Sequence, residues 1–332
     1  MGKYDGELFM RPFVSKAEQG DLEAQLKLIE LCKTLDQPKA RYYWASEAAK
    51  TGAPEGVMER AMCYILGSGV SENPKMGLEM ISPYVERNDP RALNVLGSYY
   101  EVAENNPEKA MSYYQRSMAY GYDNGTYNYA RMIRYGLGCP REPYKALPIL
   151  EKLADQGHTA AAMDAYLIYS DTFDEGLHVD WQKAERLLRV CAEGGDGWAM
   201  WKLATIYDPA ENSPESNYAL CMQWLKRGAA TGRVEAMTSL AAKYLELNGS
   251  LADVAELLDT ALPKLDWFRT WEGGEIAIEE FEDVLCWAAS KDGFSAYLTP
   301  GLIDYAKQHR LREVLACVQP QKKGVFSRLF GG

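Results

Sequence analysis

The side chains best suited to catalysis or metal binding are few and widely spaced in this sequence. Its three histidines are His158, His178 and His309, and no two lie at the spacing that places both imidazoles on one helix face. The seven cysteines include no Cys-x-x-Cys pair. These residues predict no catalytic residue, no metal site and no cofactor, so we expect a protein that is not an enzyme.

Six carboxylates between Glu272 and Asp283 form a dense acidic cluster. One interpretation is a docking strip for a basic partner or a divalent cation. The other is a solvated helix face, because acidic residues near a helix N-terminus complement the helix dipole. We favour the solvated face.

Two Gly-x-Gly segments, at 67–69 and 136–138, could be mistaken for phosphate-binding loops. Neither continues to a third Gly or to a Gly-Lys-Ser/Thr ending. Both are therefore predicted to be turns between helices.

A periodic pattern indicates which elements position these residues. Landmark residues recur at intervals of 32, 36, 33, 36, 38 and 37 residues, at Gly20, Gly52, Asn88, Gly121, Gly157, Gly195 and Gly232. A small residue follows each landmark four residues later, and Tyr follows twelve residues later in five of the seven units. A period near 35 residues is typical of stacked two-helix repeats rather than of one globular core.

Each unit is predicted to contain two helices. The landmark residue suits the left-handed position that ends a helix, and the first helix of the unit follows it. Pro or Asp shortly before Lys-Ala announces the second helix, as in Asn106-Pro107-Glu108-Lys109-Ala110. The fold class is therefore all-α.

The recurring Ala, Leu-Gly, Tyr, Gly-x-Gly-Val and Lys-Ala placements resemble the Sel1-like repeat family, relatives of the tetratricopeptide repeats. The resemblance implies a right-handed α-α superhelical solenoid of about seven repeats, with a divergent C-terminal helical cap. It also implies a concave face, lined by first helices, that holds a protein or peptide. The sequence departs from the pattern where Asn88 replaces the landmark Gly and where Gly56 and Gly125 replace Ala.

The repeat register sets the expected domain boundaries. We expect an N-terminal cap over residues 1–16, the solenoid over 17–248, a C-terminal helical cap over 249–318 and a basic amphipathic tail over 319–332. A solenoid needs such caps because its terminal repeats would otherwise leave an apolar face uncovered.

Composition narrows the class of partner. A net charge of −11 lacks the basic footprint that binding to a phosphate backbone requires, so we expect no nucleic-acid partner. The sequence shows neither a signal peptide nor an apolar run of 18 residues, and its cysteines are predicted to be reduced thiols. We therefore expect a cytoplasmic protein, with a peripheral membrane position as the alternative.

The candidate partner-binding residues follow a landmark by three, six, seven or ten residues, off the predicted packing side of the first helix. They vary from repeat to repeat and combine aromatic, Arg and Asn side chains, as a recognition surface does. These residues are Arg91, Asn94, Tyr127, Asn128, Arg131, Trp198 and Trp201. For Trp201, packing between neighbouring repeats is the alternative interpretation.

The tail carries three positive charges and no acid in an otherwise acidic chain. Its candidate docking residues are Lys322, Lys323, Phe326, Arg328, Leu329 and Phe330. The leading function is an adaptor or scaffold that binds a protein or peptide. The alternatives are a peripheral membrane scaffold that makes weak contacts through the tail, and an enzyme with an unrecognised site in the C-terminal cap. The partner's identity and the oligomeric state stay open.

Overall fold

The computed structural model describes residues 10–34, 37–170, 180–211, 216–268 and 274–318. Within these ranges the structure contains α-helices and short 3₁₀ turns but no β-strand, as the sequence predicts. Fourteen of the helices form seven hairpins: α2/α3 (Leu22–Thr34, Pro38–Lys50), α4/α5 (Pro54–Leu66, Pro74–Val85), α6/α7 (Pro90–Val102, Pro107–Ala119), α8/α9 (Asp123–Tyr135, Pro143–Asp155), α10/α11 (Thr159–Ser170, Trp181–Glu193), α12/α13 (Gly197–Tyr207, Tyr218–Ala230) and α14/α15 (Val234–Glu246, Leu251–Ala261). The predicted two-helix repeat is confirmed.

The remaining helices flank these hairpins. They are α1 (Arg11–Glu18) before the first hairpin and α16 (Leu265–Phe268), α17 (Glu275–Ala289), α18 (Pro300–His309) and α19 (Arg312–Val318) after the last. Short 3₁₀ turns at Pro209–Glu211, Leu262–Lys264 and Phe294–Tyr297 complete the assigned elements. In the described part of the chain, no helix combines the length and apolarity needed to cross a bilayer.

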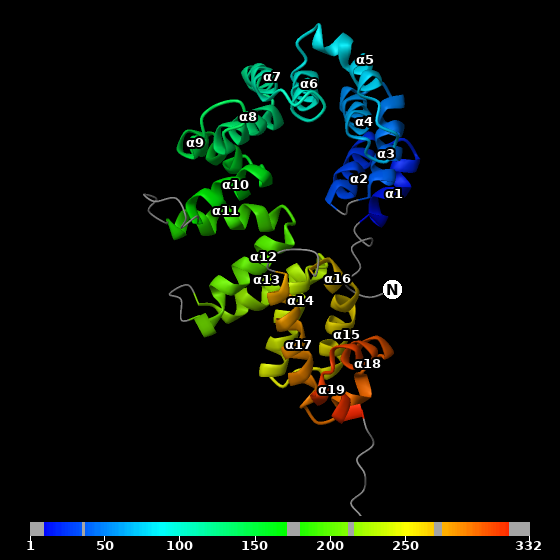
Figure 1. The fold of residues 1–332 in the computed structure, drawn as a ribbon, viewed down its shortest axis with the longest axis vertical. Coiled ribbons are helices and arrows are strands. Elements are labelled where there is room, and N and C mark those ends of the chain that lie inside the picture. Colours follow the sequence, from blue (N-terminus) through cyan, green and yellow to red (C-terminus); the bar gives the residue numbers. More distant parts are fainter. Residues whose placement is uncertain (1–9, 35–36, 171–179, 212–215, 269–273, 319–332) are drawn as a thin grey trace, which may run out of the picture. The chain divides into compact units, whose positions relative to one another are not determined.

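The helices divide into two compact units (Figure 1). The N-terminal unit holds α1 to α11 and ends at Gly194, and the C-terminal unit holds α12 to α19. Within the N-terminal unit the first helix of each hairpin contacts the next first helix, in the order α4, α6, α8 and α10. In the C-terminal unit α12 contacts α14 in the same way. Each unit is therefore a stretch of α-solenoid in which a repeat packs on its neighbours.

The landmark residues end the second helices as predicted. All seven have a left-handed backbone, with φ from 55° at Asn88 to 101° at Gly195. Asn is among the few residues other than Gly that enter this region readily, so Asn88 preserves the turn geometry that the other repeats obtain from Gly.

The small residues four positions after the landmarks are buried, and two of them, Gly56 and Gly125, lie where the first helix meets the second helix of the preceding hairpin. At Gly56 an added Cβ would lie 2.4 Å from the carbonyl carbon of Ala48, and at Gly125 it would lie 2.1 Å from Ser117 Oγ. The two departures from Ala are therefore positions where the helices approach too closely for a methyl group.

The repeat register predicts that the tyrosines twelve positions after the landmarks are buried, and the structure agrees only in part. Tyr169 and Tyr207 are buried, whereas Tyr64, Tyr100 and Tyr244 are half-buried. The half-buried rings lie near the C-terminal end of a first helix, beside the turn that leads to the second helix. There the Tyr64 hydroxyl lies 2.9 Å from the Tyr42 hydroxyl.

The Gly-x-Gly segments are turns, and their second glycine contacts the preceding repeat. Gly69 has φ 75°, and a Cβ built there would lie 2.1 Å from the carbonyl oxygen of Pro38, at the start of α3. Gly138 has φ 72° and makes the equivalent approach to Pro107, at the start of α7. These glycines let the turn of one hairpin rest on the preceding hairpin without side-chain overlap.

The C-terminal cap continues the stacking of first helices. α17 packs against α14 and α15, so it occupies the place that the first helix of another repeat would take. Its buried residues Ala277, Phe281 and Leu285 recur every four positions along one helix face. α17 thereby covers the side of the last hairpin on which a further repeat would pack.

Candidate functional site

The candidate site is the first-helix face of the N-terminal unit, formed by α2, α4, α6, α8 and α10. On each of these helices the buried residues define the packing side; positions three and ten after the landmark lie off it, as does position six except at the buried Met58. The structure places five of the predicted partner-binding residues on α6 and α8 of this face: Arg91, Asn94, Tyr127, Asn128 and Arg131.

Polar contacts join successive first helices along this face. Each contact links residues 30 to 36 positions apart, about one repeat. We call this set the polar ladder, and its pairs are Glu55–Arg91, Asn94–Asn128, Glu101–Arg131, Asn124–His158 and Arg134–Asp164. Four predicted residues, Arg91, Asn94, Asn128 and Arg131, thus belong to three of these pairs.

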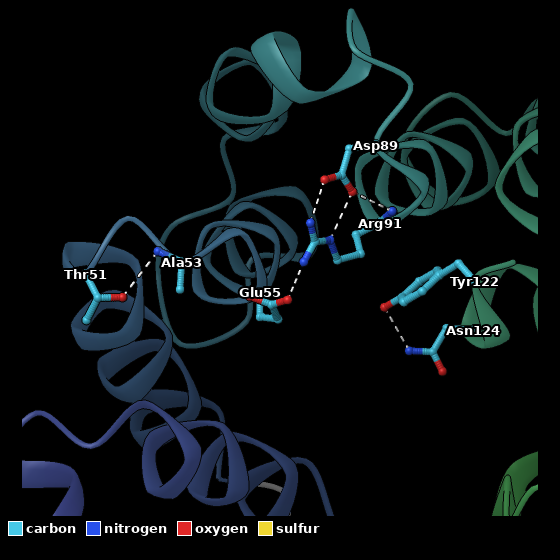
Figure 2. A network of polar contacts seen from close by, with 7 residues as sticks. All are labelled: Thr51, Ala53, Glu55, Asp89, Arg91, Tyr122 and Asn124. Carbon is cyan, nitrogen blue, oxygen red and sulfur yellow. Dashed lines mark hydrogen bonds and ion pairs between the residues drawn. The ribbon is translucent and has the colours of Figure 1, made fainter. Parts of the chain in front are cut away.

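Arg91 bridges two carboxylates on neighbouring helices (Figure 2). Its Nη2 lies 2.7 Å and its Nε 3.0 Å from the Asp89 carboxylate, and its Nη1 donates to Glu55 on α4. Asp89 also caps α6 by accepting from the Arg91 backbone N–H at 2.9 Å. The hydrogen bonds from Arg91 hold the pKa of Asp89 below its usual value. The guanidinium is therefore fixed in position and its charge is balanced.

Arg131 is held in a similar way one repeat further on. Its Nη2 lies 2.5 and 2.6 Å from the two oxygens of Glu101 on α6. The hydroxyl of Tyr114, a fully buried residue of α7, donates to the same carboxylate at 2.8 Å. Burial raises the pKa of Tyr114, so it stays a neutral donor. Glu101 is thereby also held by α7, the second helix of its own hairpin.

Tyr127 lies beside the start of α10. Its ring centroid is 5.0 Å from that of His158, whose Nδ1 caps α10 by accepting from the Ala161 backbone N–H at 3.2 Å. Burial, with a further contribution from Asp164, raises the pKa of Tyr127. Burial also lowers the pKa of His158, so the neutral imidazole that this cap requires is favoured.

The two predicted tryptophans belong to the C-terminal unit, on α12. Both are half-buried. Trp201 Nε1 donates to Ser239 Oγ on α14 at 3.2 Å. Trp201 therefore makes a contact between neighbouring repeats, as the alternative interpretation of this residue predicts. Trp198 stands one turn earlier on the same helix. Their role in binding stays a prediction.

A pocket opens on the first-helix face at the end formed by α2, α4 and α6. Its apolar lining comes from Leu26, Ile29 and Met58, and its carboxylates are Glu30, Glu55 and Glu59. The remaining lining residues are Lys33, Arg91 and Tyr122. Tyr122 reaches it from the turn before α8 and accepts a hydrogen bond from Asn124 Nδ2 at 3.1 Å (Figure 2).

The residues that sequence reasoning missed are the acidic partners of the ladder, Glu55, Glu101 and Asp164. A signal for Glu55 was present, because it stands three positions after its landmark, as Arg91 does. Opposite charges one repeat apart are candidates for pairing across stacked first helices. Asp164 is the least accessible of the three, with its side chain 10% exposed in the pair with Arg134.

Among the described residues, no group of three His, Cys, Asp or Glu side chains is placed to hold a metal ion. The predicted docking residues of the tail, from Lys322 to Phe330, lie outside the described residues.

Comparison with known proteins agrees with the helix hairpins. The Sel1 repeat model matches residues 54–81, 90–117, 123–158 and 199–232. A Sel1 repeat protein from Oxalobacter formigenes has a similar structure, with a TM-score of 0.53 and 21% identity, over 78% of this chain and 78% of that one. A protective antigen of uropathogenic Escherichia coli that displays an SLR fold aligns over 93% of this chain and 78% of its own, with 19% identity and a TM-score of 0.48.

The four matched segments coincide with α4/α5, α6/α7, α8/α9 and α12/α13, and the similar structure shares the fold. Such solenoids commonly act as scaffolds for protein interactions and are typically not enzymes. Residues 54–81, 90–117, 123–158 and 199–232 are therefore Sel1 repeats.

Proposed function

We propose that this protein is an adaptor that binds an extended segment of another protein across the first-helix face of its N-terminal unit. The observation that carries the proposal is the pairing of Asn94 with Asn128 at the middle of the polar ladder. Asn128 Nδ2 donates to Asn94 Oδ1 at 2.8 Å, so the two amides from neighbouring repeats form one unit.

This amide pair has the hydrogen-bonding groups that a peptide main chain needs. An Asn side chain carries one carbonyl acceptor and two N–H donors. The bond between them uses one donor of Asn128 and the acceptor of Asn94. Donors on Asn94 Nδ2 and the acceptor Asn128 Oδ1 remain for the C=O and N–H of a bound peptide group, and both side chains are half-buried.

The neighbouring side chains are arranged before a partner arrives. Arg91 and Arg131 flank the pair and are held by carboxylates, so little rotamer freedom remains to be lost on binding. Because these carboxylates balance the two arginines, the face does not require an anionic ligand. An uncharged main chain fits it.

Removing both amides should weaken binding while leaving the fold intact. We expect the Asn94→Ala/Asn128→Ala variant to bind peptides selected on the wild type roughly tenfold to a hundredfold more weakly, since two hydrogen bonds are lost. The peptides come from panning a random 12-residue phage library on the full-length protein, and fluorescence anisotropy measures the dissociation constants.

The matched control replaces two exposed amides on second helices, Gln115→Ala/Gln182→Ala, and should bind as the wild type does. Equal affinities of the Asn variant and this control would move the binding site away from the amide pair.

We also propose a cytoplasmic location. All seven cysteines are free thiols, and Cys32, Cys63, Cys191 and Cys221 are buried, as suits a reducing compartment.

A membrane-associated scaffold is the alternative function, supported by the three positive charges and the apolar residues of the tail. Each basic residue near an anionic bilayer contributes about 1 kcal/mol, so attachment through this one segment would be weak and reversible. We expect salt-sensitive sedimentation of the full-length protein with phosphatidylserine-containing liposomes, and its loss after deletion of residues 320–332. A full-length protein that stays in the supernatant at low salt would contradict this alternative.

A further inference from the structure

The pocket between α2, α4 and α6 lies next to the amide pair. Arg91 lines the pocket and precedes Asn94 by three residues, which is nearly one helical turn on α6. An extended segment that crosses Asn94 advances about 3.3 Å per residue, so a side chain one or two residues away reaches the pocket. What occupies the pocket therefore determines which segments the proposed adaptor accepts, and the inference rests on that proposed function.

The buried part of the pocket is apolar. Ile29 and Met58 are 2% and 5% exposed, and Leu26 is half-buried beside them. The pocket has a volume of about 200 Å³, and the ring of Tyr122 contributes to its wall. This lining suits an aliphatic stem and offers an aromatic face near which a cation is stabilised.

The mouth of the pocket is acidic. The side chains of Glu30 and Glu55 are 67% and 42% exposed, so their carboxylates face a side chain that enters from solvent. Glu59 lies deeper, 2.5 Å from Lys33 and 3.1 Å from Arg41.

The two cations in the lining are already engaged. Lys33 pairs with Glu59, and Arg91 pairs with Asp89, which lies outside the lining, as well as with Glu55. Glu30 pairs with Lys27 at 2.8 Å in an exposed contact, which contributes little stability and exchanges readily. The carboxylates at the mouth can therefore accept a further cation.

We infer that this pocket binds the side chain of a Lys or Arg in the partner segment. The aliphatic stem packs on Leu26, Ile29 and Met58, and the cationic head lies between Glu30 and Glu55. An acidic side chain would meet three carboxylates, and a wholly apolar one would desolvate the acidic mouth without pairing it. The chain's net charge of −11 also attracts a basic segment over longer distances.

The test compares peptide selection on three full-length proteins. The same 12-residue phage library is panned on the wild type, on Glu30→Gln/Glu55→Gln, and on the control Glu79→Gln/Glu108→Gln, whose exposed carboxylates lie on the second helices α5 and α7. We expect the wild type and the control to enrich peptides with one recurrent Lys or Arg between apolar residues. We expect the pocket variant to lose that preference.

A quantitative test measures the dissociation constants of one enriched peptide and of its analogue. In the analogue, Met replaces the recurrent basic residue. The pocket variant should bind the basic peptide roughly tenfold more weakly than the wild type does, because a charge-assisted contact is lost, and should lose much less affinity for the Met analogue, which makes no such contact. A thermal melt confirms that each variant is folded.

Two results would overturn the inference. One is enrichment of peptides without a recurrent basic residue, which would leave the adaptor function standing. The other is an equal loss of affinity for both peptides in the pocket variant. A library that yields no enriched peptide on the wild type would contradict the proposed adaptor function as well.

Discussion

Replacing Gly69 with Ala is expected to lower the free energy of unfolding of the N-terminal unit by about 2–5 kcal/mol. Two costs add at this position. An L-residue at φ 75° costs about 1–2 kcal/mol, and inserting a methyl group into a closely packed contact costs about 1–3 kcal/mol. The overlap here is with backbone, since the new Cβ would lie 2.1 Å from the Pro38 carbonyl oxygen, so no side-chain rotation relieves it.

The control for this variant is Gly121→Ala. Gly121 has nearly the same φ, 78°, but a Cβ there would have no neighbouring atom within 4 Å. We expect this change to cost only the conformational part, about 1–2 kcal/mol. Urea unfolding followed by far-ultraviolet circular dichroism compares the two variants, and equal midpoints would show that the Gly69 turn does not rest on α3.

Truncation of Tyr207 is expected to destabilise the C-terminal unit by about 3–5 kcal/mol, because a buried ring leaves a cavity that its neighbours fill only in part. Tyr207 is 4% exposed at the end of α12, twelve residues after the landmark Gly195. Its position in the repeat predicts that the ring is buried, and the structure confirms it.

Tyr297→Ala is the matched control in the same unit, because Tyr297 is 46% exposed. A surface substitution of this kind should change stability by less than about 0.5 kcal/mol. The urea midpoints of unfolding of the two variants and the wild type measure these changes in stability. Coincident midpoints for Tyr207→Ala and the wild type would mean that its ring contributes nothing to the hairpin.

The sequence by itself determined the repeat and the positions at which one hairpin ends and the next begins. A left-handed residue is needed wherever one helix ends and the next hairpin begins, and only Gly or Asn meets that need cheaply. Because this local requirement recurs once per repeat, landmarks such as Asn88 and Gly121 are visible without knowledge of the packing. The helical period then predicts which face is buried, and this placed Arg91, Asn94 and Arg131 off the packing side.

Tertiary structure alone decided how those exposed residues are paired. The contact of Arg131 with Glu101 depends on how far α8 is shifted along α6, and many packing side chains set that shift together. The same is true of the approach of Gly69 to Pro38 and of the apolar lining that Leu26 and Met58 bring together from two repeats. Local backbone preferences repeat along a chain and can be read from it, whereas contacts between repeats depend on offsets that only the packed helices determine.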